Sequence, residues 1–180
     1  MRHLILLFFL FTPLFGFSQE YFTKTGSVVF LSKAPLNEFE GRSKALNGLI
    51  DLEKNLLDFY LDLNTLDTGI GLRDKHMREN YLETEKYPYA EFTGKMDPIP
   101  ALEIGKSYPV KAKGKFKIHG VEREITVQGT LTQKNDRSLE LQSEFVILLD
   151  DYKIDIPKLV FYELSSEQKV RINATLSPKK

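Results

Sequence analysis

The chain has 180 residues, in which 25 basic side chains balance 25 acidic ones, and it has no cysteine. This length suits one domain with a substantial core, and the charge balance gives no electrostatic reason to expect a nucleic-acid partner. The lack of cysteine excludes disulfides, thiolate metal sites and cysteine nucleophiles, so the core alone must hold the fold together.

The N-terminal segment has the form of a secretion signal. Arg2 supplies a positive charge, and residues 4–11 form an apolar run too short to span a bilayer, which needs about 20 residues. The small residues Gly16 and Ser18 precede a cleavage site before Gln19. We therefore expect a signal peptide over residues 1–18, a single domain over residues 19–180, and an exported protein, periplasmic or secreted. A membrane anchor is the alternative.

After the signal, apolar and polar residues alternate along most of the chain, as in strands that bury one face. The clearest case is the segment that contains Leu57, Phe59 and Leu61 on one face, with polar residues between them. The predicted strands, in chain order, are residues 26–35, 39–43, 46–53, 55–64, 89–96, 108–118, 121–133, 138–148 and 169–177.

Residues 64–92 break this alternation. Residues 67–69 form a turn, Asp74 is able to cap a helix, and the run to about Thr84 is rich in helix formers. Pro88 ends any helix, because it biases the residue before it away from the α region. We expect this helical insertion to close one end of the fold.

The most secure structural prediction is a hairpin whose two-residue turn lies at residues 119–120. In that register Lys117 faces Glu122 and Lys115 faces Glu124, so charge and turn length agree. The two lysines belong to a row of four that is able to contact an anionic membrane surface. The opposed glutamates neutralise much of that row, which favours an ordinary solvated strand.

Half-solvated strands argue against a parallel sheet covered by helices. The pattern predicts an all-β fold, a closed antiparallel barrel of about eight strands, with one helical insertion after the fourth strand candidate, residues 55–64. A barrel of this size either fills its interior with side chains or holds one small ligand. Composition leaves both possibilities open.

Chemistry-bearing motifs are sparse. After the signal the only histidines are His76 and His119, in different predicted elements, which does not suit a zinc site. No Gly-x-Ser-x-Gly motif is present. Strand parity turns nearly all carboxylates outward, whereas an enzyme acting on an apolar substrate would need paired carboxylates inside the barrel. We therefore predict no metal, no catalytic residue and no enzymatic activity.

Four motifs follow one another along the chain: Leu-Asp-Thr-Gly at 66–69, Arg-Asp-Lys-His-Met-Arg at 73–78, Tyr-Pro-Tyr-Ala-Glu-Phe at 87–92 and Ile-His-Gly-Val at 118–121. Their order and spacing resemble the YceI-like family, exported bacterial proteins with a lipocalin-like barrel that bind polyisoprenoid lipids. Met77 departs from the usual Leu of that family, which is a near-isosteric change.

The resemblance implies a cargo held inside the barrel by apolar side chains. The expected ligand-binding residues are Phe30, Phe39, Leu57, Phe59, Leu61, Met77, Tyr81, Phe92, Phe116, Arg123 and Phe145. Arg123 is included because its parity places it on the apolar face beside the hairpin turn, where it would meet a lipid head group. The alternative is that Arg123 extends outward into solvent.

The expected function is therefore that of an exported carrier for a long isoprenoid, quinone-like or polyprenyl-like, or for another amphiphilic lipid. No cofactor is expected apart from this cargo. We expect a monomer or a homodimer, with at most transient contact to a membrane surface and no nucleic acid. The alternative is a non-enzymatic, stress-related interaction module whose barrel is filled with side chains.

Overall fold

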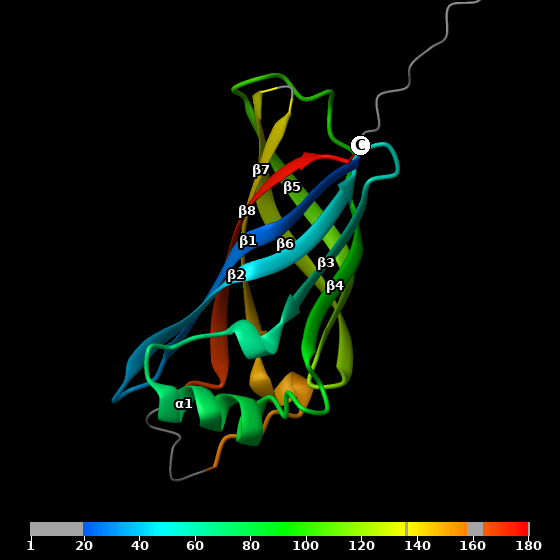
Figure 1. The fold of residues 1–180 in the computed structure, drawn as a ribbon. Coiled ribbons are helices and arrows are strands. Elements are labelled where there is room, and N and C mark those ends of the chain that lie inside the picture. The colour runs from blue at the N-terminus through cyan, green and yellow to red at the C-terminus, as the bar shows by residue number, and fades with distance from the viewer. Residues whose placement is uncertain (1–19, 136, 158–163, 180) are drawn as a thin grey trace, which may run out of the picture.

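The computed structural model describes residues 20–135, 137–157 and 164–179, which form a closed antiparallel barrel of eight strands with α1 across one end (Figure 1). The expected signal peptide lies outside these residues. The strands are β1 (Glu20–Lys33), β2 (Glu38–Asp51), β3 (Leu56–Asp62), β4 (Tyr89–Met96), β5 (Ser107–Ile118), β6 (Val121–Asn135), β7 (Ser138–Leu148) and β8 (Glu167–Pro178).

Each strand pairs with the next one in the chain, and β8 pairs with β1 to close the sheet. This confirms the predicted barrel, which follows from strands that each have one apolar face. The helical insertion also follows the segment predicted, residues 55–64. That segment is the third strand rather than the fourth, because the segments predicted at 39–43 and 46–53 are one strand, β2.

A β-bulge explains why β2 looked like two strands. Val28 of β1 pairs with Ser43, and Gly26 pairs with Leu46, so two steps along β1 oppose three steps along β2. Because of the extra residue, the inward-facing side chains of β2 change from odd-numbered positions such as Ser43 to even-numbered ones such as Leu46. Both of these residues are buried. An alternation that changes phase within a strand looks like a break when only the sequence is read.

The helix within the insertion begins earlier than predicted. The α-helix α1 runs from Gly71 to His76 and continues as a π-helical turn from Met77 to Tyr81. Asp74 is therefore inside the helix, and the expectation that it caps the N-terminus is wrong. Its carboxylate instead accepts hydrogen bonds from Thr68, at 2.8 Å from the backbone N and 2.6 Å from Oγ1. Asp74 thus fastens the preceding turn onto the helix.

The β5–β6 hairpin has the predicted register, in which Lys115 faces Glu124 and Lys117 faces Glu122. The ion pairs nevertheless run diagonally or to another strand. Lys115 Nζ lies 2.8 Å from Glu122 Oε1, and Lys117 Nζ lies 3.1 Å from Glu91 Oε2 on β4. The right-handed twist of neighbouring strands favours such diagonal contacts between long side chains.

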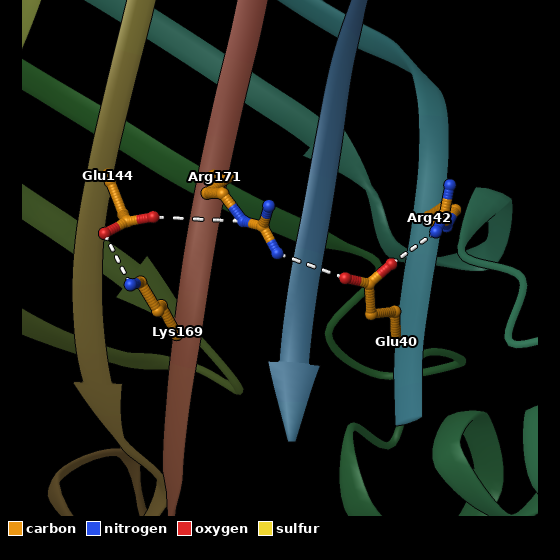
Figure 2. A network of polar contacts seen from close by, with 5 residues as sticks. All are labelled: Glu40, Arg42, Glu144, Lys169 and Arg171. Atoms are coloured by element: carbon orange, nitrogen blue, oxygen red, sulfur yellow. Dashed lines mark hydrogen bonds and ion pairs between the residues drawn. The ribbon is translucent and has the colours of Figure 1, made fainter. Parts of the chain in front are cut away.

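A charged network crosses the seam where the barrel closes (Figure 2). Glu144 of β7 contacts Lys169 and Arg171 of β8, and Arg171 reaches across β1 to Glu40 of β2, at 3.1 Å between Nη2 and Oε1. Glu40 also pairs with Arg42. Exposed ion pairs contribute little one by one, but this network fits one alignment of four strands and so favours the observed register.

The interior is packed unevenly. At the end of the barrel opposite α1, inward side chains from five strands are buried together in the core. We call this region the packed end; it consists of Ile50, Met96, Leu131, Leu139 and Leu176. All five are at most 3% exposed, so this end supplies a continuous hydrophobic core.

Nearer the middle of the barrel, glycine makes room for aromatic rings. Gly48 of β2 pairs with Phe59 of β3, and the Phe59 ring lies over the glycine. A Cβ at Gly48 would lie 2.1 Å from the Cδ1 and Cε1 atoms of that ring. Gly41 stands in the same relation to Phe30, with a Cβ position 2.1 Å from its Cε1. The absence of a side chain at these positions therefore sets where both rings lie.

We predict that Gly48→Ala destabilises the fold by about 1–3 kcal/mol, because the added methyl group forces the Phe59 ring off its position. Thermal and denaturant unfolding measure this change. Gly71→Ala is the matched control: nothing lies within 4 Å of its Cβ position and it is a helical residue, so it should be neutral or slightly stabilising. Equal losses of stability in the two variants would contradict this packing account.

Candidate functional site

The α1 end of the barrel is hollow. It contains a partly open cavity of about 480 Å³, within the usual range for ligand sites. All eight strands contribute to its wall, together with the insertion and the chain that follows β7. None of the five residues of the packed end belongs to this wall. The barrel therefore has a solid end and a hollow end, and the hollow end is the candidate site.

Ten of the eleven predicted ligand-binding residues line the cavity: Phe30, Phe39, Leu57, Phe59, Leu61, Met77, Tyr81, Phe92, Phe116 and Phe145. The structure brings them together because strand parity turns each strand residue of this set inward, and because the π-helical turn holds Met77 and Tyr81 over the opening of the barrel. Whether they bind a ligand is a separate question, addressed below.

Arg123 is the exception. It faces Phe116 across the hairpin, as parity predicts, but it is exposed and lies outside the cavity wall. Its Nε donates a hydrogen bond of 3.0 Å to the backbone carbonyl of Asp151. The chain after β7 supplies this acceptor next to the hairpin, so the guanidinium turns away from the interior. Arg123 therefore lies as the alternative expected, with its side chain extended outward and not toward a lipid head group.

The insertion supplies the wall residues that the sequence reading missed, among them Leu63, Leu66, Ile70, Leu72 and Arg73. It covers a gap, since the β2–β3 ladder runs from the Asp51–Leu56 pair only to the Asn47–Tyr60 pair. Beyond that point Arg42 of β2 pairs with Asp67 of the insertion instead, through two backbone hydrogen bonds of 2.8 and 2.9 Å. The insertion thus completes the wall where the strands separate.

The opening of the cavity is marked by residues that belong to its wall and are also exposed. Ile70 is 54% exposed and Leu72 is 64% exposed, both at the start of α1. Leu36, in the turn between β1 and β2, is 76% exposed at the same end of the barrel (Figure 1). We call these three residues the apolar rim. Exposed leucine and isoleucine beside an apolar cavity are typical of a surface that meets an apolar partner.

Arg73 gives the opening a fixed positive charge. Its guanidinium carbon lies 4.2 Å from the centre of the Phe39 ring, in a cation–π contact. Its Nε donates to Thr68 Oγ1 at 3.0 Å, and its Nη2 donates to the Thr68 carbonyl at 3.2 Å. Thr68 is in turn held by Asp74, so Arg73 is positioned by contacts on both faces.

Asp74 itself is 8% exposed. Burial acts to raise the pKa of its carboxyl group, but the hydrogen bonds from Thr68 and the nearby Arg78 outweigh burial and hold the pKa below its ordinary value of 3.8. The carboxylate is therefore charged at neutral pH and stabilises the junction between residues 67–69 and α1.

A second junction secures the other side of the same end. His119 has a positive φ of 53° in the hairpin turn, an angle that histidine tolerates. Its Nδ1 donates to the Tyr152 carbonyl at 3.1 Å, and its Nε2 lies 2.6 Å from Glu83 Oε2. Its ring meets Tyr87 edge to face. One side chain thus joins the hairpin, the end of the insertion and the chain after β7.

Tyr152 fills the gap between β6 and β7, whose ladder stops at the Gln128–Glu144 pair. It is 2% exposed, and its ring meets Phe116 edge to face, with centroids 5.5 Å apart. Burial raises the pKa of its hydroxyl group above the ordinary value, so the side chain stays neutral. Aromatic packing therefore seals this side of the cavity.

The described residues offer little for catalysis or metal binding. They contain no group of three or more His, Cys, Asp or Glu side chains that is able to hold a metal ion. Of the carboxylates described, only Glu91 belongs to the cavity wall, and it is paired with Lys117 on the outer face. No helix in the described ranges is both long and apolar enough to cross a bilayer.

These features define a closed β-barrel with an internal apolar site. The model of one family, the YceI-like domain, matches residues 22–177, and the chain belongs to that family. This confirms the resemblance carried by the four sequence motifs. A comparison with curated proteins finds no match.

Solved structures share the fold. A polyisoprenoid-binding domain from Saccharophagus degradans, implicated in plant cell wall breakdown, has 22% identity and a TM-score of 0.78, covering 89% of this chain and 99% of its own. BcnA from Burkholderia cenocepacia has 17% identity and a TM-score of 0.69, covering 84% and 96%. The YceI protein of Campylobacter jejuni has 20% identity and a TM-score of 0.61, covering 78% and 85%.

We predict that Asp74→Asn lowers the free energy of unfolding at about pH 7 by about 1 kcal/mol, because a charged hydrogen-bond acceptor is replaced by a neutral one. A lowered pKa in the folded state means that this stability is present above the ordinary value of 3.8 and is lost as the pH falls through the folded value.

The difference between wild type and Asp74→Asn should therefore shrink in denaturant unfolding at about pH 3. Asp58→Asn, on the exposed face of β3, is the control and should change little at either pH. A difference for Asp74→Asn that stays constant across this range would contradict the assignment.

Proposed function

We propose that the protein binds a long apolar lipid inside the barrel, an isoprenoid of the quinone or polyprenyl type or another amphiphile, and acts as a carrier rather than as an enzyme. The observation that carries this proposal is the cavity at the α1 end, whose wall is mostly apolar and which opens beside α1. The Saccharophagus degradans neighbour is a polyisoprenoid-binding domain, which supports the same class of ligand.

The physical basis is burial of hydrocarbon. Each methylene group removed from water contributes about 0.8 kcal/mol, so a short stretch of isoprenoid chain in this cavity would approach the affinity of about 8 kcal/mol that corresponds to micromolar binding. Such affinity needs no specific polar contact along the chain.

The alternative of an interaction module with a side-chain-filled barrel fits only the packed end. It does not account for about 480 Å³ of apolar space at the other end. Without a ligand, such a space costs the fold the packing energy that its side chains would otherwise gain. A cavity retained at this cost favours the carrier over the module.

We also propose that the mature protein is exported, and is periplasmic or secreted. The support is the sequence of residues 1–18, with its basic start, short apolar run and small residues before Gln19. A chain without cysteine is equally able to fold in an oxidising compartment. A carrier outside the cytoplasm would move lipids that water alone cannot transport between membranes.

The apolar rim is the surface through which we propose that the carrier contacts a lipid bilayer during loading and release. Its residues Ile70 and Leu72 continue directly into the cavity wall, so a lipid would pass from bilayer to barrel without crossing water. The lysine row of β5 is less suited to this contact, because Lys113, Lys115 and Lys117 are all ion-paired.

We predict that protein purified without detergent yields an isoprenoid or other amphiphilic lipid on organic extraction and mass spectrometry. The intact mass of the same sample should correspond to a chain that begins at Gln19. Phe59→Asp should lose the lipid, since a carboxylate in the apolar wall is costly. Ala90→Trp, which fills the cavity without adding charge, should lose it as well.

Val146→Asp is the control, because Val146 is exposed on the outer face of β7 and does not belong to the wall. It should retain the lipid. A folded Phe59→Asp or Ala90→Trp variant with full lipid occupancy would rule out the cavity as the binding site.

We predict that Leu36→Ser slows transfer of a fluorescent isoprenoid from phosphatidylcholine vesicles to the protein by about fivefold or more, because removing a leucine from the contact loses about 1.5–3 kcal/mol of burial. Ile104→Ser is the matched control, since Ile104 is 63% exposed in the β4–β5 loop at the opposite end of the barrel. Equal transfer rates for both variants and wild type would exclude the rim as the bilayer contact.

A further inference from the structure

The cavity wall contains one polar side chain whose hydrogen bonding is incomplete. Gln168 is the second residue of β8, and it faces inward in the same alternation as Val170 and Ile172. It is 5% exposed and belongs to the cavity wall at the α1 end, where it pairs with Ser32 of β1 and Ile147 of β7. A polar residue at this position needs an explanation, because its neighbours in the wall are apolar.

The amide nitrogen of Gln168 is fully used. Nε2 donates to the Ser165 carbonyl at 2.6 Å and to Ser32 Oγ at 3.2 Å. Because a carbonyl oxygen only accepts, the short contact to Ser165 identifies which end of the amide is the nitrogen. Ser32 Oγ also accepts from the Ser165 backbone N at 3.1 Å, so the side chain is held from two segments.

The amide oxygen has no partner. Gln168 Oε1 is the one buried side-chain nitrogen or oxygen without a hydrogen bond in the described part of the chain. Buried polar atoms are nearly always paired, and an unpaired acceptor destabilises the fold. Because Oε1 is itself buried while Gln168 belongs to the cavity wall, a rotation of the amide toward the cavity would allow a ligand to supply the missing donor.

The chemistry of the donor limits the ligand. An isoprenoid chain has no N–H or O–H group, so the donor must belong to the head group. Ser32 Oγ already accepts two hydrogen bonds and is fully buried outside the cavity wall, so it holds the Gln168 amide in place and does not contact the head group. A hydroxyl group matches the Gln168 oxygen because it is able to donate, whereas an ether or a quinone carbonyl only accepts.

We propose that Gln168, supported by Ser32, recognises a hydroxyl group on the head of the cargo, as in a polyprenol or in the reduced, quinol form of an isoprenoid quinone. This proposal rests on the proposed lipid-binding function and adds to it the class of head group that the protein recognises. Most other residues of the wall are apolar and bind chains without regard to the head group, and Gln168 is the wall residue with an unpaired buried acceptor, so we assign discrimination for a hydroxyl group to this site. It also orients the cargo, with its polar head at the α1 end.

The first test compares two probes with the same chain, a polyprenol and its methyl ether, in a fluorescence displacement titration of the wild-type protein. The polyprenol should bind about tenfold more tightly, since the ether leaves Oε1 unpaired. A second pair, a quinol under reducing conditions and its quinone, distinguishes the two sources of hydroxyl. Preference for the hydroxyl member of either pair supports the proposal, and equal affinity in both pairs overturns it.

The second test uses Gln168→Met, which keeps the length of the side chain but removes the amide. The preference for the hydroxyl probe should fall to near unity, and affinity for the methyl ether should stay about the same. Lys169→Met, at the next residue of β8 but exposed on its outer face and outside the cavity wall, is the matched control and should keep the full preference. A folded Gln168→Met protein that also keeps the full preference would overturn the assignment, and the wild-type comparison decides the matter if that variant does not fold.

These outcomes separate the two levels of inference. A protein that binds both members of each pair equally remains a lipid carrier but has no hydroxyl site. A protein that binds none of the four probes contradicts the proposed function itself.

Discussion

The hollow end of the barrel depends on where two hydrogen-bonded ladders stop. The β2–β3 ladder ends at the Asn47–Tyr60 pair, and the β6–β7 ladder ends at the Gln128–Glu144 pair. Beyond these points each of the four strands is hydrogen-bonded to only one neighbouring strand. Other segments of the chain therefore complete the wall of the barrel. The insertion covers the first gap, and the chain that carries Tyr152 covers the second. Longer ladders would draw the strands together and leave the inward side chains without space between them.

The alternation of apolar and polar residues was enough to predict most of the fold and much of the candidate site. A period of two is a local property, and it assigned Phe59, Phe116 and Phe145 to the inner face without knowledge of their neighbours. The same reading placed Lys115 opposite Glu124, because turn length and charge agreed. The phase change inside β2 was hidden, since a bulge depends on the partner strand, here on how Gly26 meets Leu46.

Other features depend on contacts between distant segments. Parity placed Arg123 correctly on its strand, but the carbonyl of Asp151, which turns the side chain away, comes from a different part of the chain. Gln168 was missed because the predicted strand began at Lys169, two residues after β8 begins, although its alternation with Val170 continues the pattern. Whether the interior is hollow was not decidable from composition, because the same phenylalanines suit a filled barrel or a lined one.

The packed end has a consequence for the size of the cargo. Because Leu131 and Leu139 are fully buried and fill their end of the barrel, a chain that enters beside α1 meets a solid floor. The depth of the hollow beyond Gln168 therefore limits how many carbons of a chain can be buried while its head group contacts Gln168. Substituting smaller residues at the packed end would deepen the cavity. The protein would then accept longer chains, but its thermal stability would fall.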